Sequence, residues 1–132
     1  MKALALAAAL VVGVLHVSPA AAAEPWHHGV STFYSWQQYG CGVYKSWAIS
    51  CARRGHFACG GLYQHATVAV AHLSLPCGTK VRLRNPANGR EVTAVVRDRG
   101  PFARGLDFDL TTAACEAIRH CYTGPLDWRV VP

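Results

Sequence analysis

Six cysteines, all of them after residue 40, leave this chain of 132 residues a narrow choice of folds. They are Cys41, Cys51, Cys59, Cys77, Cys115 and Cys121. An even number of cysteines in a small exported domain is typical of a disulfide framework, so we expect three bridges. Zinc is the competing use of these residues. No C-x-x-C or H-x-x-x-H spacing occurs, so we expect neither a metal nor another cofactor.

Residues 1–23 have the pattern of a secretory signal peptide. One lysine precedes an unbroken apolar run, and Ala21 and Ala23 then fit an A-x-A cleavage rule. The apolar run is shorter than the roughly 20 residues that a membrane span needs. A lipid anchor would require a cysteine directly after the cleavage site, and the first cysteine is Cys41. We therefore expect residues 24–132 to form one secreted domain without a membrane anchor, in the periplasm, the cell wall or outside the cell, and to be monomeric.

The mature part of the chain is basic. Of the 13 lysines and arginines, Lys2 lies in the signal segment, which leaves 12 against 7 acidic residues and a net charge of +5. These charges are spread along the chain, which is the ordinary pattern of a solvated surface. Attraction to an anionic wall polymer is the more specific interpretation. The combined aromatic and basic signatures of nucleic-acid-binding modules are absent, so we expect no nucleic acid partner.

The clearest secondary-structure pattern is a β-hairpin. Residues 80–84 alternate with a period of two, Asn88-Gly89 is a favoured hairpin turn, and residues 91–97 alternate again. The candidate core residues of this hairpin are Val81, Leu83, Val92, Ala94 and Val96.

The other segments predict shorter elements. Strands are expected at residues 29–34, 67–72 and 127–131, and a helix at 110–121 with Thr111 as its cap. The residues of this helix expected to face inward are Ala114, Ala117 and Ile118. A long, bridged loop should follow the first strand. The pattern is that of a mainly β protein, a small barrel with one short helix.

Residues 70–114 also carry a distinctive series of motifs. In VAHLSLPCGTKVRLRNPANGREVTAVVRDRGPFARGLDFDLTTAA, an Ala-His precedes Leu-Pro-x-Gly-Thr, an Asn-Gly hairpin leads to an Asp-Arg-Gly-Pro-Phe corner, and an Asp-Leu precedes a helix. This series resembles the rare lipoprotein A-like family of bacterial cell-wall proteins, and residues 29–34, GVSTFY, are similar to the family's opening strand. The resemblance leaves out residues 35–57. It implies a six-stranded double-psi β-barrel, which expansins and barwin-like plant proteins share.

The resemblance implies an activity and its residues. The family carries out lytic transglycosylation of peptidoglycan, in which an acid protonates the glycosidic oxygen and the 6-hydroxyl of the sugar closes an anhydro ring. By motif, Asp98 takes the position of the acid and His72 a supporting one. In expansin-like barrels, activity needs the aspartate at the position of Asp109. Asp98 and Asp109 would then share a groove, where like charges raise the pKa of one of them.

The residues also have simpler interpretations. Asp98 could be a surface carboxylate paired with Arg97 or Arg99. Against this, the Gly100-Pro101 corner should end the strand and turn Asp98 toward a cleft. Asp109 could serve only as a carboxylate near a helix start or in a turn.

Three further residues are candidates for binding substrate. Thr32 matches a groove-facing position of the opening strand, although threonine is also a common β-former. Trp36 and Tyr39 could stack on sugar rings, although aromatic residues in a bridged loop more often fill a small core.

The sequence departs from the family at two places. Gly61 stands where the active transglycosylases carry a glutamate, and a glycine cannot transfer a proton. Cys59 and Cys77 replace two other residues of the family pattern, and this paired change implies that they are bonded to each other. Local spacing favours Cys41 with Cys51 and Cys115 with Cys121, provided that the helix ends before Cys121.

The sequence therefore predicts a secreted protein that acts on glycan strands of peptidoglycan or on another cell-wall polysaccharide, in the manner of a lytic transglycosylase. The alternative is a non-catalytic, expansin-like module that loosens the wall or binds glycan, which Gly61 favours. A barwin-like defence or inhibitor protein is the third class.

Overall fold

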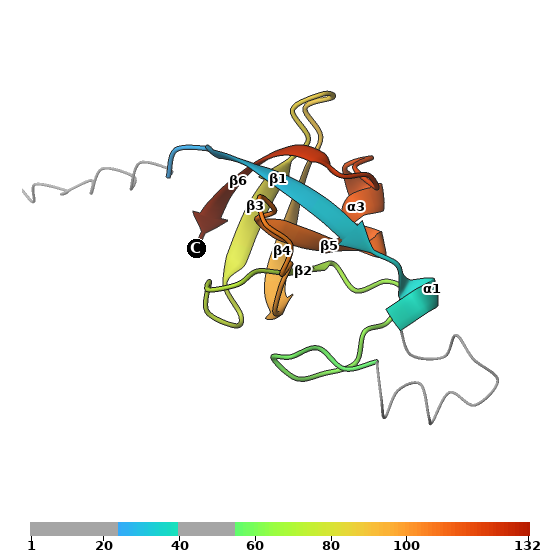
Figure 1. The fold of residues 1–132 in the computed structure, drawn as a ribbon. Helices are drawn as coiled ribbons and strands as arrows, with labels where there is room; N and C mark the ends of the chain where they lie inside the picture. The colour runs from blue at the N-terminus through green and yellow to red at the C-terminus, as the bar shows by residue number, and fades with distance from the viewer. Residues whose placement is uncertain (1–23, 40–54) are drawn as a thin grey trace, which may run out of the picture.

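The computed structural model describes residues 24–39 and 55–132, which form a closed barrel of six strands in the order β1-β5-β2-β4-β3-β6 (Figure 1). The predicted signal peptide and the predicted Cys41–Cys51 bridge lie outside the described residues. The elements are β1 His27–Tyr34, α1 Trp36–Tyr39, β2 Ala69–Ala71, β3 Lys80–Arg84, β4 Glu91–Asp98, β5 Phe108–Thr111, α3 Thr112–Ala117 and β6 Gly124–Val131. The expected barrel is confirmed.

Two parallel pairings give the barrel its topology. β1 pairs with β5 and β2 pairs with β4 in parallel, whereas the other four neighbouring pairs are antiparallel. The predicted hairpin is the β3–β4 pair, in which Val81 lies opposite Ala94 and Leu83 opposite Val92.

The barrel interior is filled by apolar side chains from the strands and from α3. Four of the five predicted hairpin core residues are fully buried, and the fifth, Val92, packs against them from a partly buried position. From α3 and its end, Ala114 and Ile118 enter this core as predicted. Ala117 does not, because it lies on the exposed side of the helix.

Two elements differ from the sequence-based expectation. A helical turn, α1, follows β1 directly because Ser35 caps it, accepting the amide of Gln37 on its hydroxyl and that of Tyr39 on its carbonyl. The strand β5, which the sequence pattern does not predict as a separate strand, runs into α3 without a loop. Thr111 stands at the N-cap as predicted, but its hydroxyl makes no cap bond and donates to the Thr67 carbonyl at 2.7 Å.

Two disulfides staple the described part of the chain, and both were predicted. Cys59 is bonded to Cys77, with their Cα atoms 5.8 Å apart. Cys115 is bonded to Cys121 at 4.9 Å. The second bridge is possible because α3 ends at Ala117, and the chain then reverses through Arg119 with φ 52°.

A buried carboxylate ties three strands together on the outer side of the barrel. Asp127 of β6 accepts a 2.6 Å hydrogen bond from His28 of β1 and a 2.7 Å bond from the Arg84 guanidinium of β3. Burial by itself would raise the pKa of Asp127. The bonds and charges of Arg84 and His28 outweigh it and hold that pKa below its usual value.

We expect Asp127→Asn to lower the free energy of unfolding by about 2 kcal/mol at pH 7, because hydrogen bonds to a charged group are the stronger kind. The pKa of Asp127 is lower in the folded state, so its contribution is present above the pKa of an unfolded aspartate. It is lost as the pH falls through the folded value. Denaturant unfolding from pH 7 to pH 3 should show that the difference in the free energy of unfolding between the variant and the wild type becomes smaller.

Glu91→Gln is the control. It removes the exposed 3.4 Å pair with Arg82 and should change stability by less than about 1 kcal/mol. Equal losses from both variants would contradict this account.

Candidate functional site

One row of residues crosses four neighbouring strands and contains three of the predicted site residues. Thr32 of β1 lies opposite Asp109 of β5, Asp109 lies opposite Ala71 of β2, and Ala71 lies opposite Asp98 of β4. Residues in register on adjacent strands project from the same side of a sheet. β2 pairs in parallel with β4, with a register irregularity between Val70 and Ala71, and antiparallel with β5. These two pairings bring Asp98 and Asp109 to one groove, on either side of Ala71.

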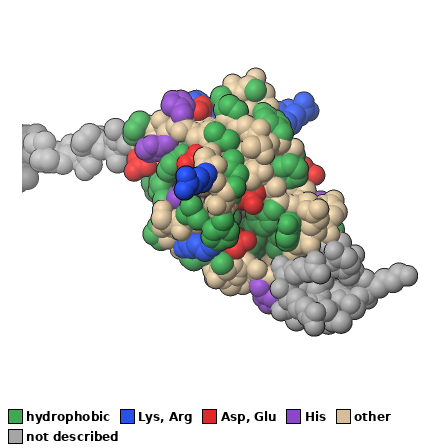
Figure 2. Space-filling model, viewed as in Figure 1, with side chains coloured by type: hydrophobic (Ala, Val, Ile, Leu, Met, Phe, Trp, Pro, Cys, Tyr) green, Lys and Arg blue, Asp and Glu red, His purple; other side chains and the backbone are tan. Residues whose placement is uncertain are grey.

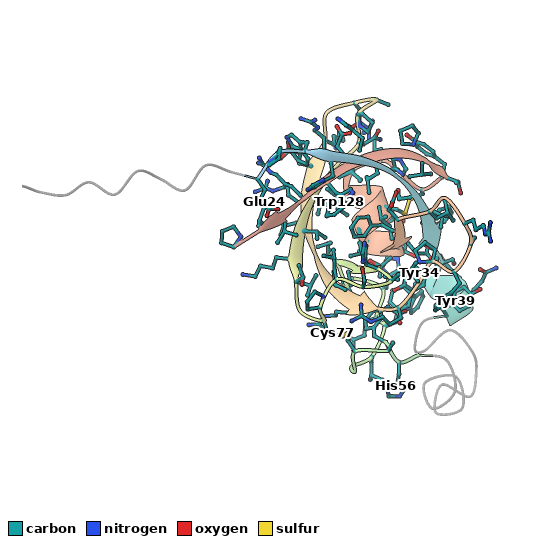
Figure 3. The ribbon with its side chains drawn as sticks, turned by 60° about the vertical axis from the view of Figure 1, so that its left-hand side comes forward. Glu24, Tyr34, Tyr39, His56, Cys77 and Trp128 are labelled. Carbon is teal, nitrogen blue, oxygen red and sulfur yellow. A yellow bond between two sulfur atoms is a disulfide. The ribbon has the colours of Figure 1, made fainter. Side chains whose placement is uncertain are left out.

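This row forms part of a groove with a volume of about 390 Å³. Figure 2 shows a hollow near the centre of the face, with acidic and hydrophobic side chains at its edge. Figure 3 shows Tyr34, Tyr39 and His56 on one side of the barrel. The residues that line the groove are Thr32, Tyr34, Tyr39, His56, Phe57, Tyr63, Ala71, Asp98, Arg99, Gly100, Pro101, Phe102, Ala103, Leu106 and Asp109.

Asp98 is held in the groove by backbone amides. Its Oδ1 accepts hydrogen bonds from the amides of Ala58 at 2.9 Å and Arg99 at 3.0 Å. Within residues 24–39 and 55–132 it forms no ion pair, so the interpretation as half of a surface pair with Arg97 or Arg99 has no support in the geometry. The strand β4 ends at Asp98, as expected from the Gly100-Pro101 corner.

Asp109 occupies a different environment. Its Oδ1 is buried and has no hydrogen-bond partner in the part of the chain that the structure describes. Burial raises the pKa of Asp109 to about 6, and the nearby charge of Asp98 contributes in the same direction. Asp109 is therefore the carboxyl group of this pair that can hold a proton near neutral pH, while Asp98 has amide donors suited to a carboxylate.

Tyr34 is a groove residue that the sequence analysis missed. Its hydroxyl is buried and, among the described residues, has no hydrogen-bond partner of good geometry. Burial raises the pKa of Tyr34, and the charges of Asp98 and Asp109 raise it further, so the phenol stays protonated. The signal was available, because Tyr34 lies two residues after Thr32 and the alternation of β1 places both on one side.

The three predicted binding residues have different positions. Thr32 lines the groove, and its hydroxyl accepts a 3.1 Å bond from Thr123. Tyr39 also lines the groove and is 47% exposed. Trp36 does not line it. Its ring packs on the small core of Phe57 and Tyr63, as the simpler interpretation expected.

His72 also lies outside the groove lining and instead shapes the chain behind it. Its Nδ1 accepts the amides of Ser74 at 3.1 Å and Leu75 at 2.9 Å, and its ring packs on Phe108. Burial lowers the pKa of His72, which favours the neutral ring that this acceptor role requires. The His72 carbonyl in turn accepts a 3.0 Å bond from the Arg99 guanidinium.

The Cys59–Cys77 bridge holds one wall of the groove. The Cys59 amide donates to the Arg97 carbonyl at 2.9 Å, which places Ala58 beside Asp98, and Arg99 donates to the Cys77 sulfur at 3.2 Å. Gly61, at the position of the family glutamate, has φ +90°, and a Cβ there would lie 3.6 Å from the Arg97 guanidinium. It does not line the groove.

We expect the double variant Cys59→Ser/Cys77→Ser to lose about 3 kcal/mol of stability, because the bridge closes a loop of 18 residues. It should also speed hydrogen exchange of the Ala58 amide, since the segment that donates this amide to Asp98 is released. Cys115→Ser/Cys121→Ser is the matched control. It should lower stability, but exchange of the Ala58 amide should become faster only as far as the lower global stability requires. Unchanged exchange at Ala58 in the first variant would show that the bridge does not position this wall.

We expect a carboxyl-carbon NMR titration to show Asp109 half protonated near pH 6. Asp98→Asn should lower this midpoint, because it removes a negative neighbour, but burial should keep it above the usual value for aspartate. Between about pH 4 and pH 6 the native state holds a proton that the unfolded chain has lost, so stability should fall as the pH rises through this range. Asp109→Asn should remove that slope. A wild-type midpoint near 4 would contradict the assignment.

Neither a metal site nor a membrane helix is found in the described residues. No group of three or more histidine, cysteine, aspartate or glutamate side chains in residues 24–39 and 55–132 could hold a metal ion. In the same ranges no helix is both long and apolar enough to cross a membrane.

The fold and the groove define the class: a six-stranded double-psi β-barrel with two carboxyl groups on one surface. The chain belongs to the lytic transglycolase family, whose sequence pattern matches residues 29–127. It is 44% identical over 61 residues to the probable endolytic peptidoglycan transglycosylase RlpA of Nostoc sp., covering 46% of this chain and 16% of that protein. It is 36% identical over 67 residues to the endolytic peptidoglycan transglycosylase RlpA of Yersinia pestis, covering 51% of this chain and 19% of that protein. The chain thus spans less than a fifth of the length of these relatives.

Solved structures share the fold. An expansin of Clavibacter michiganensis superposes with a TM-score of 0.58 and 21% identity, covering 82% of this chain and 51% of the expansin. The Streptomyces papain inhibitor superposes with a TM-score of 0.57 and 20% identity, covering 84% of this chain and 98% of the inhibitor. A mutant of the Clavibacter expansin has been solved in complex with cellohexaose.

Proposed function

We propose that this protein is secreted and cleaves glycan strands of peptidoglycan in the groove, as a lytic transglycosylase. The observation that carries the proposal is the row in which Asp109, with its buried Oδ1 and raised pKa, and the amide-anchored Asp98 lie on either side of Ala71. Membership of the lytic transglycolase family supports the reaction class. The two described disulfides support an oxidising compartment.

In this reaction Asp109 is the acid. It donates its proton to the glycosidic oxygen as the bond from that oxygen to C1 breaks. The 6-hydroxyl oxygen of the same sugar then bonds to C1, and its proton passes to the Asp109 carboxylate, which restores the acid for the next reaction. Asp98 is the negative group that stabilises the positive charge developing at C1. The reaction activates no water, so the carboxyl spacings of ordinary hydrolases do not apply.

This assignment differs from that of the motif, which gives the acid position to Asp98. The reason is the environment of each group. Asp98 is anchored by two backbone amides, whereas burial raises the pKa of Asp109 to about 6. A general acid is most effective when its pKa lies near the working pH, which fits Asp109 better.

A second candidate function is glycan binding without cleavage, as in an expansin-like module. Gly61 favours it, because a glycine cannot supply the carboxyl group that the motif places at this position in active relatives. Exposed aromatic rings also favour it, since Tyr39 is 47% and Phe102 is 82% exposed on the groove lining. Such rings can stack on sugars.

Incubation of the purified protein with peptidoglycan, followed by mass spectrometry, separates the two functions. Lytic cleavage yields anhydro-ended muropeptides. Asp109→Asn should reduce their formation by about 100-fold or more, since a general acid contributes at least that much. Asp98→Asn should also reduce it strongly. The control is Asp107→Asn, which alters an exposed carboxylate outside the groove lining that accepts the Val30 amide at 2.9 Å. It should leave product formation unchanged.

Two outcomes would overturn the proposed reaction. If the protein binds peptidoglycan but produces no anhydro-ended muropeptides, the second candidate function, glycan binding without cleavage, is the one supported. Full activity of both Asp98→Asn and Asp109→Asn, with only a lower melting temperature, would remove the groove as the site.

A further inference from the structure

Basic residues that are scattered in the sequence come together on the outer surface of β3 and β6, because the pairing of these strands places them next to one another. In β3, Val81 and Leu83 point into the core, so Lys80, Arg82 and Arg84 project outward. Each of these three cations lies in the middle of a row, with one neighbour on β4 and one on β6.

The row of Arg84 is internally neutralised. Arg84 lies opposite Glu91 of β4 and Asp127 of β6, and Asp127 lies opposite His28 of β1. Arg84 donates to Asp127 at 2.7 Å, and His28 bonds the other oxygen of the same carboxylate. This row therefore holds the barrel together and leaves little charge for a partner.

The next two rows contain no acidic residue on β3, β4 or β6. Arg82 lies directly opposite Arg129, and Lys80 lies between Val95 and Val131. We call Lys80, Arg82 and Arg129 the basic rows. Like charges directly opposite each other on adjacent strands destabilise a sheet. Local rules of this kind are broken mainly where a function requires it.

The protein's own acids contribute little to balancing these charges. Only Arg82 has an acidic partner, Glu91 at 3.4 Å, and both side chains are more than a quarter exposed. In the described residues neither Lys80 nor Arg129 forms an ion pair. The Arg129 guanidinium donates to the Glu24 backbone carbonyl at 3.5 Å.

A tryptophan orders part of this surface. The Arg129 guanidinium lies 4.5 Å from the centroid of the Trp26 ring, and that of Arg84 lies 4.2 Å from it. Stacking on a ring fixes the plane of a guanidinium while leaving its N–H edge free to donate. Arg129 is thereby held ready for an oxyanion with less loss of side-chain entropy on binding.

We propose that the basic rows bind a linear acidic polymer of the cell wall that carries one oxyanion, a phosphate or a carboxylate, on each repeat. Arginine presents a fork of donors that fits both groups. Lys80 and Arg82 are two residues apart on one strand, a distance of about 7 Å, and Arg82 and Arg129 are about 5 Å apart across the pair. Successive oxyanions of one polymer can therefore contact neighbouring cations.

This surface is separate from the groove. The groove row runs over β1, β5, β2 and β4, centred on β5 and β2, and in a closed ring of six strands β3 and β6 lie opposite that pair. In Figure 3, Glu24, which borders the basic rows, and Tyr39 and His56, which border the groove, lie on opposite sides of the barrel. A polymer on the basic rows would hold the protein at the wall and leave the groove open.

The test uses the purified protein with two soluble probes, poly(glycerol phosphate) and polygalacturonate, titrated by calorimetry at several salt concentrations. Arg82→Gln/Arg129→Gln should weaken binding on the order of 10- to 30-fold at low salt, as expected for two surface cations. The dependence of affinity on salt should become shallower. Binding of either probe supports the proposal, and the preferred probe identifies the oxyanion.

Two controls give the result its meaning. Arg90→Gln/Arg119→Gln makes the same change of net charge at exposed positions outside the basic rows, and should weaken binding less than about 3-fold. Asp109→Asn should leave polymer binding unchanged, so a failure of the groove and a failure of this surface are distinguishable. Equal weakening by both arginine pairs, or no binding of either probe to the wild type, would overturn the proposal.

Discussion

The pairing of β2 on both of its edges is the constraint on which the site depends. This strand has only three residues, all buried, and it pairs in parallel with β4 and antiparallel with β5. Ala71 at its end therefore lies between the strand that carries Asp98 and the strand that carries Asp109. The two carboxyl groups are 11 positions apart in the sequence, but it is β2, inserted between their strands, that sets their separation in space.

Different surroundings give the two aspartates different chemistry. The wall that carries Ala58 supplies Asp98 with an amide donor, and the turn at Arg99 supplies another. Asp109 stands on a strand that leads straight into α3, and its Oδ1 has no donor from the described residues. Burial raises the pKa of Asp109, whereas Asp98 accepts two backbone amides. One groove therefore contains a carboxyl group with a raised pKa and a second one that is anchored by the backbone.

Local patterns were sufficient to predict the hairpin and much of its core, because alternation with a period of two and an Asn-Gly turn specify β3 and β4 by themselves. The motif series selected Asp98 and Asp109, and the resemblance of the opening strand selected Thr32; all three line one groove. Tyr34 was missed although its spacing from Thr32 on one strand was visible in the sequence. The basic rows were missed because they depend on which strands become neighbours, and a sequence shows no register between distant strands. The helical turn α1 was missed because a single capped turn has no periodicity. His72 was placed by motif, but its ring nitrogen is occupied by the backbone of its own loop.

The Cys59–Cys77 bridge has a mechanical consequence. A polymer strand under tension in the groove would pull on the wall formed by the segment around Phe57. Apart from the bridge, non-covalent contacts join this wall to the barrel: the packing of Phe57 with Tyr63 and Ala69, and hydrogen bonds such as those from Cys59 to Arg97 and from Ala58 to Asp98. Hydrogen bonds of this kind open one at a time under load, whereas a covalent link does not open at comparable forces. The bridge therefore transmits a pull on this wall to the chain at Cys77, just before β3, and the wall cannot peel away from the barrel that carries the two aspartates.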